Sequence, residues 1–139
     1  MNYLPYERTV HYYETDRMGI VHHSNYIRWF EEARLDLLEQ AGFPYSAMEQ
    51  AGLMIPVVDV SCQYHIPARY ADAVTVQPTM LSFNGVRMNF RYEVRLRNTG
   101  ELLVTGTSSH CFVDTDFKPL SIKRKYPALY NALCTLIQE

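Results

Sequence analysis

The chain has 139 residues, of which 47% are hydrophobic and 20% are charged, and its formal net charge is −2. This length and composition are typical of one globular domain, covering residues 1–139, and the charge gives no reason to expect a nucleic-acid partner or membrane binding. Three widely spaced cysteines, no signal-peptide pattern and no membrane-length apolar run favour a cytoplasmic protein with free thiols over a secreted disulfide framework.

The first predicted elements are a short strand and a long amphipathic helix. Residues 9–14 alternate apolar and polar side chains, which predicts a strand. Apolar side chains then recur at intervals of three and four residues, which predicts a helix whose stripe contains Tyr26, Phe30, Ala33, Leu37 and Ala41. Ser24 or Asn25 is a suitable N-cap and Gly42 a suitable C-terminal stop. A further helical turn is expected at residues 45–50.

Strand patterns dominate the middle of the chain, and a short helix closes it. Apolar and polar side chains alternate strictly over residues 86–98, which predicts a half-buried strand of an antiparallel sheet. Asn84-Gly85 indicates a hairpin before that strand. The four expected strands lie at residues 53–66, 74–80, 86–98 and 101–113. The closing helix is expected to carry its apolar stripe on Tyr126, Tyr130, Leu133 and Ile137.

This order of elements predicts an α+β fold. One long helix cannot cover both faces of a sheet of four or more long strands, so a partner subunit is expected.

The segment from Glu14 to Tyr26 combines the groups that an acyl-transfer site needs. Asp16 offers a carboxylate that could attack an acyl carbon or activate water. Seven residues later, His23 lies near the expected helix start, where unpaired N–H groups and the helix dipole suit a developing oxyanion. Gly19 permits a turn or a close approach. A turn aspartate is the ordinary alternative for Asp16.

Other residues of this region each have two explanations. Tyr26 could form a hydrogen bond within the site or pack in the core. The His23 imidazole could orient Asp16 or touch the atom that leaves the acyl group, or it could pack against a partner subunit, whereas His22 is assigned a structural role. Glu31 and Arg34 are spaced as an ordinary pair on the helix surface, and a structural role at a subunit interface is the other explanation for them.

These residues resemble those of the hotdog-fold thioesterases of the 4-hydroxybenzoyl-CoA thioesterase family, and within it the YbgC-like acyl-CoA thioesterases. The resemblance covers essentially the whole chain and rests on Asp16-x-x-Gly19-Ile20-Val21-x-His23-x-x-Tyr26, Phe30-Glu31-x-Ala33-Arg34 and Tyr64-x-x-Pro67-Ala68-x-Tyr70-x-Asp72. It implies an α+β hotdog fold, in which a five-stranded antiparallel sheet wraps around one long central helix. It also implies homodimers or homotetramers with active sites at the dimer interface.

The resemblance implies hydrolysis of acyl-CoA to a carboxylic acid and free coenzyme A. Asp16 would be the catalytic carboxylate, and the backbone N–H of His23 would polarise the thioester carbonyl. Arginines on the outward face of one strand suit the coenzyme A phosphates, although a solvated sheet face is the ordinary alternative. The expected substrate-binding residues are Gly19, Val21, Tyr26, Arg87 and Arg91.

No metal or other cofactor is expected. The five histidines are scattered and include no H-x-x-x-H or H-E-x-x-H spacing. Cys62 and Cys111 lie inside expected strands, where a small buried hydrophobe is the simpler explanation than a nucleophile. Some enzymes of the resembled family carry a tyrosine at the position of His23. Because this chain has histidine there, as the YbgC-like members do, an aromatic acyl substrate is a weaker expectation. The alternatives are an acyl-carrier-protein thioesterase and a non-catalytic acyl-CoA-binding hotdog protein.

Overall fold

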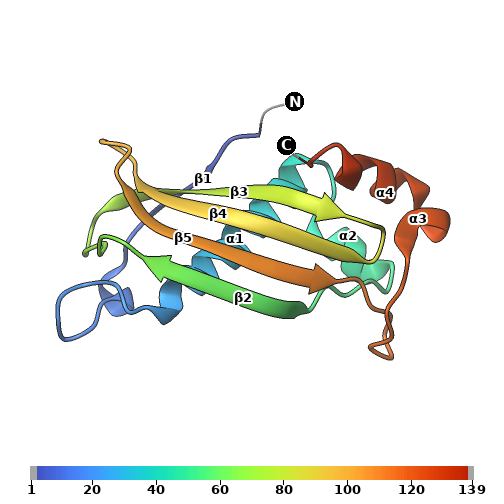
Figure 1. The fold of residues 1–139 in the computed structure, drawn as a ribbon, viewed down its shortest axis with the longest axis horizontal. Coiled ribbons are helices and arrows are strands. Elements are labelled where there is room, and N and C mark those ends of the chain that lie inside the picture. Colours follow the sequence, from blue (N-terminus) through green and yellow to red (C-terminus); the bar gives the residue numbers. More distant parts are fainter. Residues whose placement is uncertain (1–2, 138–139) are drawn as a thin grey trace. The chain divides into compact units, whose positions relative to one another are not determined.

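The structure, a computed structural model, describes residues 3–137 and contains one five-stranded sheet. The strands follow one another across this sheet in the order β1-β3-β4-β5-β2 (Figure 1). They are β1 (Tyr6–Thr9), β2 (Val57–Tyr64), β3 (Ala73–Phe83), β4 (Arg87–Leu96) and β5 (Leu102–Cys111). The helices are α1 (Ser24–Gln40), α2 (Tyr45–Gln50), α3 (Ile122–Lys125) and α4 (Pro127–Cys134). The predicted α+β class and five-stranded antiparallel sheet are confirmed.

The described residues divide into two compact units. The first contains most of the chain up to Leu37, together with Ser61–Pro78 and Tyr92–Gly106. The second contains Leu38–Val60, Thr79–Arg91 and the chain from Thr107 onward. The predicted site segment belongs to the first unit.

Helix α1 presents its predicted stripe to the core of the first unit. The buried members of the stripe are Tyr26, Phe30, Ala33 and Leu37. The Phe30 ring stacks on the Tyr92 ring of β4, with centroids 4.3 Å apart and an interplanar angle of 6°. Gly42 follows the helix with a φ of +92°, as its predicted role as a stop requires.

The strand predicted at residues 9–14 is wrong in its position. β1 lies at Tyr6–Thr9 and pairs with β3, whereas Tyr12–Glu14 forms a 3-10 turn, η1. The carboxylate of Glu14 accepts the backbone N–H of His11 at 2.9 Å. This local bond gives the backbone an alternative to strand pairing, which apolar–polar alternation cannot reveal.

The predicted strand pattern of β4 is confirmed, and so is the hairpin before it. The apolar positions Met88, Phe90, Tyr92 and Val94 are all buried. The backbone N–H of Asn84 donates to the carbonyl of Arg87 at 3.2 Å, and Gly85 takes a φ of +96°. Asparagine followed by glycine suits this turn because glycine reaches positive φ without a steric cost.

The closing helix is shorter than the predicted apolar stripe. Helix α4 begins with Pro127, after Tyr126, whose φ of −130° and ψ of 65° are not helical, so Tyr126 and Ile137 of the stripe lie outside it. Leu133 is buried as predicted, and the half-buried Tyr130 packs on Phe83 with ring centroids 5.5 Å apart. Leu129 and Leu136 are also buried, which the prediction did not include.

Gly106 of β5 lies where α1 approaches the sheet, and it provides a test of this packing. A Cβ at position 106 would overlap the Phe30 ring and lie 2.7 Å from the Ser61 carbonyl oxygen. We expect Gly106→Ala to lower the free energy of unfolding by about 1–3 kcal/mol, because the core cannot accept the added atom without strain. Denaturant unfolding measures this change.

The exposed Asp59 of β2 provides the control for that experiment. Asp59→Ala should change the free energy of unfolding by no more than about 0.5 kcal/mol. Unchanged stability of the Gly106→Ala variant would contradict the close approach.

Candidate functional site

The segment between η1 and α1 forms a tight, internally bonded loop. The backbone N–H of Asp16 donates to the Ile20 carbonyl at 2.9 Å, and that of Gly19 donates to the Asp16 carbonyl at 3.0 Å. Thr15 and Val21 pair as an antiparallel bridge across the base of the loop. Gly19 has a φ of +78° and open space where a Cβ would lie, so its missing side chain serves the turn rather than a close approach.

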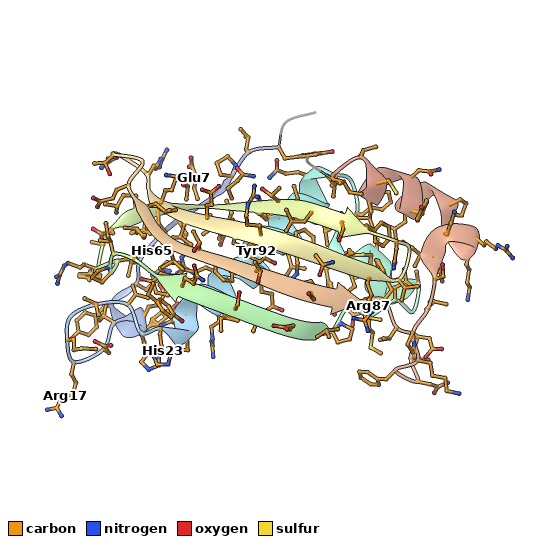
Figure 2. All side chains as sticks on the ribbon, in the orientation of Figure 1. Glu7, Arg17, His23, His65, Arg87 and Tyr92 are labelled. Atoms are coloured by element: carbon orange, nitrogen blue, oxygen red, sulfur yellow. The ribbon has the colours of Figure 1, made fainter. Side chains whose placement is uncertain are left out.

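A cavity of about 240 Å³ opens beside this loop within the first unit. Its polar groups come from Asp16, His23, Tyr64 and His65, and most of the remaining wall is apolar. The lining residues are Asp16, Met18, Ile20, Val21, His23, Tyr26, Tyr64, His65, Ile66 and Pro67. Figure 2 shows His23 near the start of α1 and Arg17 extending away from the loop.

Asp16 is both a turn residue and a lining residue of this cavity. Its Oδ1 accepts the backbone N–H of Met18 at 2.8 Å, as in an Asx turn. The side chain is half-buried. Because the turn bond uses one carboxylate oxygen, it fixes the orientation of the group and leaves the second oxygen available to a ligand. The turn explanation and the catalytic explanation are therefore compatible.

His23 directly precedes the first residue of α1 and contributes an unpaired backbone donor. Within residues 3–137, its N–H donates to no protein acceptor, whereas the N–H of His22 donates to the Glu14 carbonyl at 2.9 Å. The exposed His23 ring stacks on the His22 ring, with centroids 4.1 Å apart. Asp16 and His23 thus both line the cavity, and the backbone N–H of His23 lies at a helix start, where the helix dipole favours negative charge.

The prediction that Ser24 or Asn25 caps α1 is wrong. Ser24 is the first residue of the helix, and its N–H lies 3.3 Å from Nδ1 of His22. The same ring nitrogen lies 2.8 Å from the Ser24 hydroxyl. The imidazole of His22 therefore occupies the place of the expected cap, in agreement with the structural role predicted for His22.

Two tyrosines form the aromatic wall of the cavity. Tyr26 is 2% exposed, and its hydroxyl oxygen accepts the backbone N–H of Ala68 at 3.2 Å. Tyr64 is half-exposed, and its hydroxyl donates to the carbonyl of His23 at 3.1 Å. Partial burial and the neighbouring Cys62 thiol raise the pKa of Tyr64 to about 12, so its phenol remains a donor at neutral pH.

The structure does not bring every predicted site residue to this cavity. Val21 and Tyr26 line it, but Gly19 does not, and the exposed Arg87 and Arg91 belong to the second unit. Sequence reasoning assigned no site role to Tyr64 or His65, although Tyr64 stands in the third of the motifs that carry the resemblance.

The burial of Arg34 excludes one of its two explanations, that of an ordinary surface pair with Glu31. Arg34 is only 8% exposed, and its Nη1 donates to the hydroxyl of Tyr92 at 3.2 Å. Spacing along a helix shows which side chains are neighbours but not which face a sheet covers.

Comparison with known proteins places this chain in a family. A family model described as the thioesterase-like superfamily matches residues 10–129. The chain belongs to the thioesterase-like superfamily. A superfamily member from Staphylococcus aureus, a DHNA-CoA thioesterase of known structure, superimposes with a TM-score of 0.89 at 34% identity, covering 94% of this chain and 87% of that one. The fold is therefore the hotdog fold of these thioesterases.

Two further superfamily members are similar along nearly their whole length. YneP of Bacillus subtilis (strain 168), whose name marks it as a candidate acyl-CoA thioesterase, is 39% identical over 127 residues, which cover 91% of each chain. The acyl-CoA thioester hydrolase YbgC of Escherichia coli (O6:H1, strain CFT073) is 27% identical over 127 residues, covering 88% of this chain and 91% of its own.

Residues 3–137 contain neither a cluster of metal-ligand side chains nor a helix of membrane-spanning type. No group of three or more histidine, cysteine, aspartate or glutamate side chains is arranged to hold a metal ion in this part of the chain. No helix in it is both long and apolar enough to cross a membrane.

Tyr26 provides a test of whether its hydroxyl is a structural group. We expect Tyr26→Phe to lower the free energy of unfolding by about 1–3 kcal/mol, because the buried N–H of Ala68 would lose its acceptor. Tyr64→Phe is the matched control, and it should cost less than about 1 kcal/mol because its phenol is half-exposed. Denaturant unfolding of both variants measures this difference. Equal losses would contradict the assignment.

Proposed function

We propose that this protein hydrolyses acyl-CoA thioesters to a carboxylic acid and free coenzyme A. The observation that carries the proposal is that Asp16 and His23 line one cavity, and that the N–H of His23 has no protein acceptor within residues 3–137. Membership of the thioesterase-like superfamily and the names of the similar proteins support a thioester substrate.

In the proposed reaction, the thioester carbonyl oxygen accepts a hydrogen bond from the His23 N–H. This donor and the dipole of α1 stabilise the negative charge that develops on the oxygen. Asp16 either attacks the carbonyl carbon, forming a mixed anhydride that water opens, or removes a proton from an attacking water. Both routes break the carbon–sulfur bond, and the thiolate of coenzyme A leaves and takes up a proton.

The apolar wall of the cavity supports an apolar acyl group. Ile20, Val21 and Ile66 line it, and their side chains offer no hydrogen-bond partner to water or to a charged group. We propose that Val21 and Tyr26 contact the acyl group and that the Gly19 turn shapes the entrance. The phosphates of coenzyme A would be bound by exposed guanidinium groups, for which Arg87 and Arg91 are the proposed residues.

An acyl-carrier protein is the alternative carrier of the thioester, because it presents the same phosphopantetheine arm. Rates measured with one acyl group on both carriers distinguish the two substrates. A panel of short, long and aromatic acyl-CoAs then identifies the acyl group. If no thioester released thiol but several bound saturably, the protein would be an acyl-CoA-binding protein instead.

Asp16→Asn tests the catalytic carboxylate directly. The substitution keeps the shape of the side chain and its turn acceptor but removes the charge, so we expect kcat to fall about 10²- to 10⁴-fold while acyl-CoA still binds. Thiol release, followed with a chromogenic reagent, measures the loss. Asp116→Asn, at an exposed turn aspartate, is the control and should keep the parent rate. Near-full hydrolysis by the Asp16 variant would refute the mechanism.

Isotope labelling distinguishes the two routes for Asp16. In a single turnover in oxygen-18 water, nucleophilic attack can place the label in the Asp16 carboxylate, whereas general-base attack places it only in the product acid.

We also propose that two copies of the chain pair through β2. This strand lies at an edge of the sheet, where unpaired backbone groups invite a further strand. The alternation of side chains puts Val58, Val60 and Tyr64 on one face of β2, and they are 52%, 37% and 49% exposed. A homodimer formed edge to edge, alone or within a homotetramer, would cover this apolar face and bring the partner close to Tyr64 in the cavity.

Val58→Glu tests this dimer. A carboxylate on the apolar face should convert a dimer to a monomer, as measured by light scattering coupled to size-exclusion chromatography. Val57→Glu is the matched control, because Val57 is equally exposed but points to the opposite face of the strand. It should leave the assembly unchanged. A monomeric parent protein, or equal effects of both changes, would contradict the proposed interface.

A further inference from the structure

A buried cluster of charged groups next to the site loop has no part in the proposed chemistry. Glu14 is only 5% exposed, and its carboxylate accepts three hydrogen bonds. The donors are Nη2 of Arg8 at 2.5 Å, the backbone N–H of His11 at 2.9 Å and Nε1 of Trp29 at 2.8 Å. Glu14 is therefore bonded to β1, to its own turn and to α1.

The backbone of Glu14 is bonded to the other side of the site. Its carbonyl accepts the N–H of His22 at 2.9 Å and Nδ2 of Asn25 at 2.8 Å. Glu14 lies two residues before Asp16, and His22 directly precedes His23. One residue thus connects the segment that carries the carboxylate with the segment that carries the N–H donor.

The guanidinium of Arg8 completes this cluster. The Arg8 side chain is 9% exposed, and it lies 4.6 Å from the centroid of the Trp29 ring. Its Nη1 also donates to Glu32 at 2.8 Å. Burying an ion pair costs desolvation energy that largely offsets its attraction, so stability alone is a weak reason for this arrangement. Arg8 Nε has no partner within residues 3–137, but the hydrogen bonds of both Nη atoms and of the Glu14 carboxylate still hold these groups in one geometry.

We infer that Glu14 is a positioning residue, which fixes the Asp16 carboxylate relative to the His23 N–H through its bonds to Arg8, Trp29 and His22. This inference rests on the proposed function, because it concerns the geometry of those two groups. If Glu14 only stabilised the fold, its substitution would not change the turnover of the protein that remains folded. Displacement of reacting groups by about 1 Å is enough to slow a reaction 100-fold.

Glu32 provides a matched control for this role. It accepts a hydrogen bond from the same guanidinium, but its side chain is 42% exposed and no bond joins it to residues 15–23 within the part of the chain that the structure describes. Glu32→Gln therefore weakens the contact between β1 and α1 without releasing the site loop.

The experiment compares Glu14→Gln, Glu32→Gln and Trp29→Phe in the full-length protein, at a temperature where circular dichroism shows each to be folded. We expect Glu14→Gln to lower kcat roughly 10- to 100-fold with little change in KM, because binding of the acyl-CoA is retained while the reacting groups are displaced. Trp29→Phe removes one bond to Glu14 and should lower kcat several-fold. Glu32→Gln should keep the kcat of the parent.

Hydrogen exchange supplies a readout that does not depend on activity. Amides of residues 15–23 should exchange faster in Glu14→Gln than in the parent, and at the parent rate in Glu32→Gln. Equal kcat values for Glu14→Gln and the parent would overturn the inference, and so would equal losses from Glu14→Gln and Glu32→Gln. If Asp16→Asn loses activity while Glu14→Gln does not, only the positioning role fails. If Asp16→Asn keeps its activity, the proposed function itself fails.

Discussion

The start of α1 is the constraint on which the candidate site depends. The first N–H groups of any helix have no acceptor within the helix, so the surrounding chain must provide acceptors or leave the donors to a ligand. Here the N–H of Ser24 faces the His22 imidazole, and that of Asn25 donates to the His22 carbonyl. The N–H of His23 is left without a protein acceptor within residues 3–137, and His23 is one of the residues that line the cavity with Asp16. The proposed mechanism assigns this N–H to the carbonyl oxygen of the substrate.

Parts of the fold that follow from local periodicity could be predicted from the sequence. The stripe from Tyr26 to Leu37 and the alternation along β4 each repeat over many residues, so each pattern determines both the element and its buried face. The 3-10 turn at Glu14 and the burial of Arg34 were not predictable in this way. The Glu14 carboxylate is also bonded to Arg8 and Trp29, and Arg34 to Tyr92, and these partners come from other elements.

The candidate site shows the same division between local and distant information. Asp16, Gly19 and His23 lie within one short segment, so their spacing and the resemblance were enough to single them out. Tyr64 lies 41 residues after His23, and its hydroxyl meets the His23 carbonyl only because β2 ends beside this loop. Residue types and spacing could not predict this contact. They also could not show that His22 rather than Ser24 or Asn25 supplies the cap.

The backbone and the side chain of residue 23 have different proposed roles, and this difference explains how histidine can stand at this position. If the oxyanion donor is the backbone N–H, the chemistry does not require any particular side chain there. The His23 ring is then free to stack on His22, whose Nδ1 lies beside the first N–H of α1. A stacked neighbour restricts the orientations of the His22 imidazole and so favours the cap that keeps α1 in place. On this argument, the side chain at position 23 acts on the site through the helix start, whereas its backbone acts on the substrate.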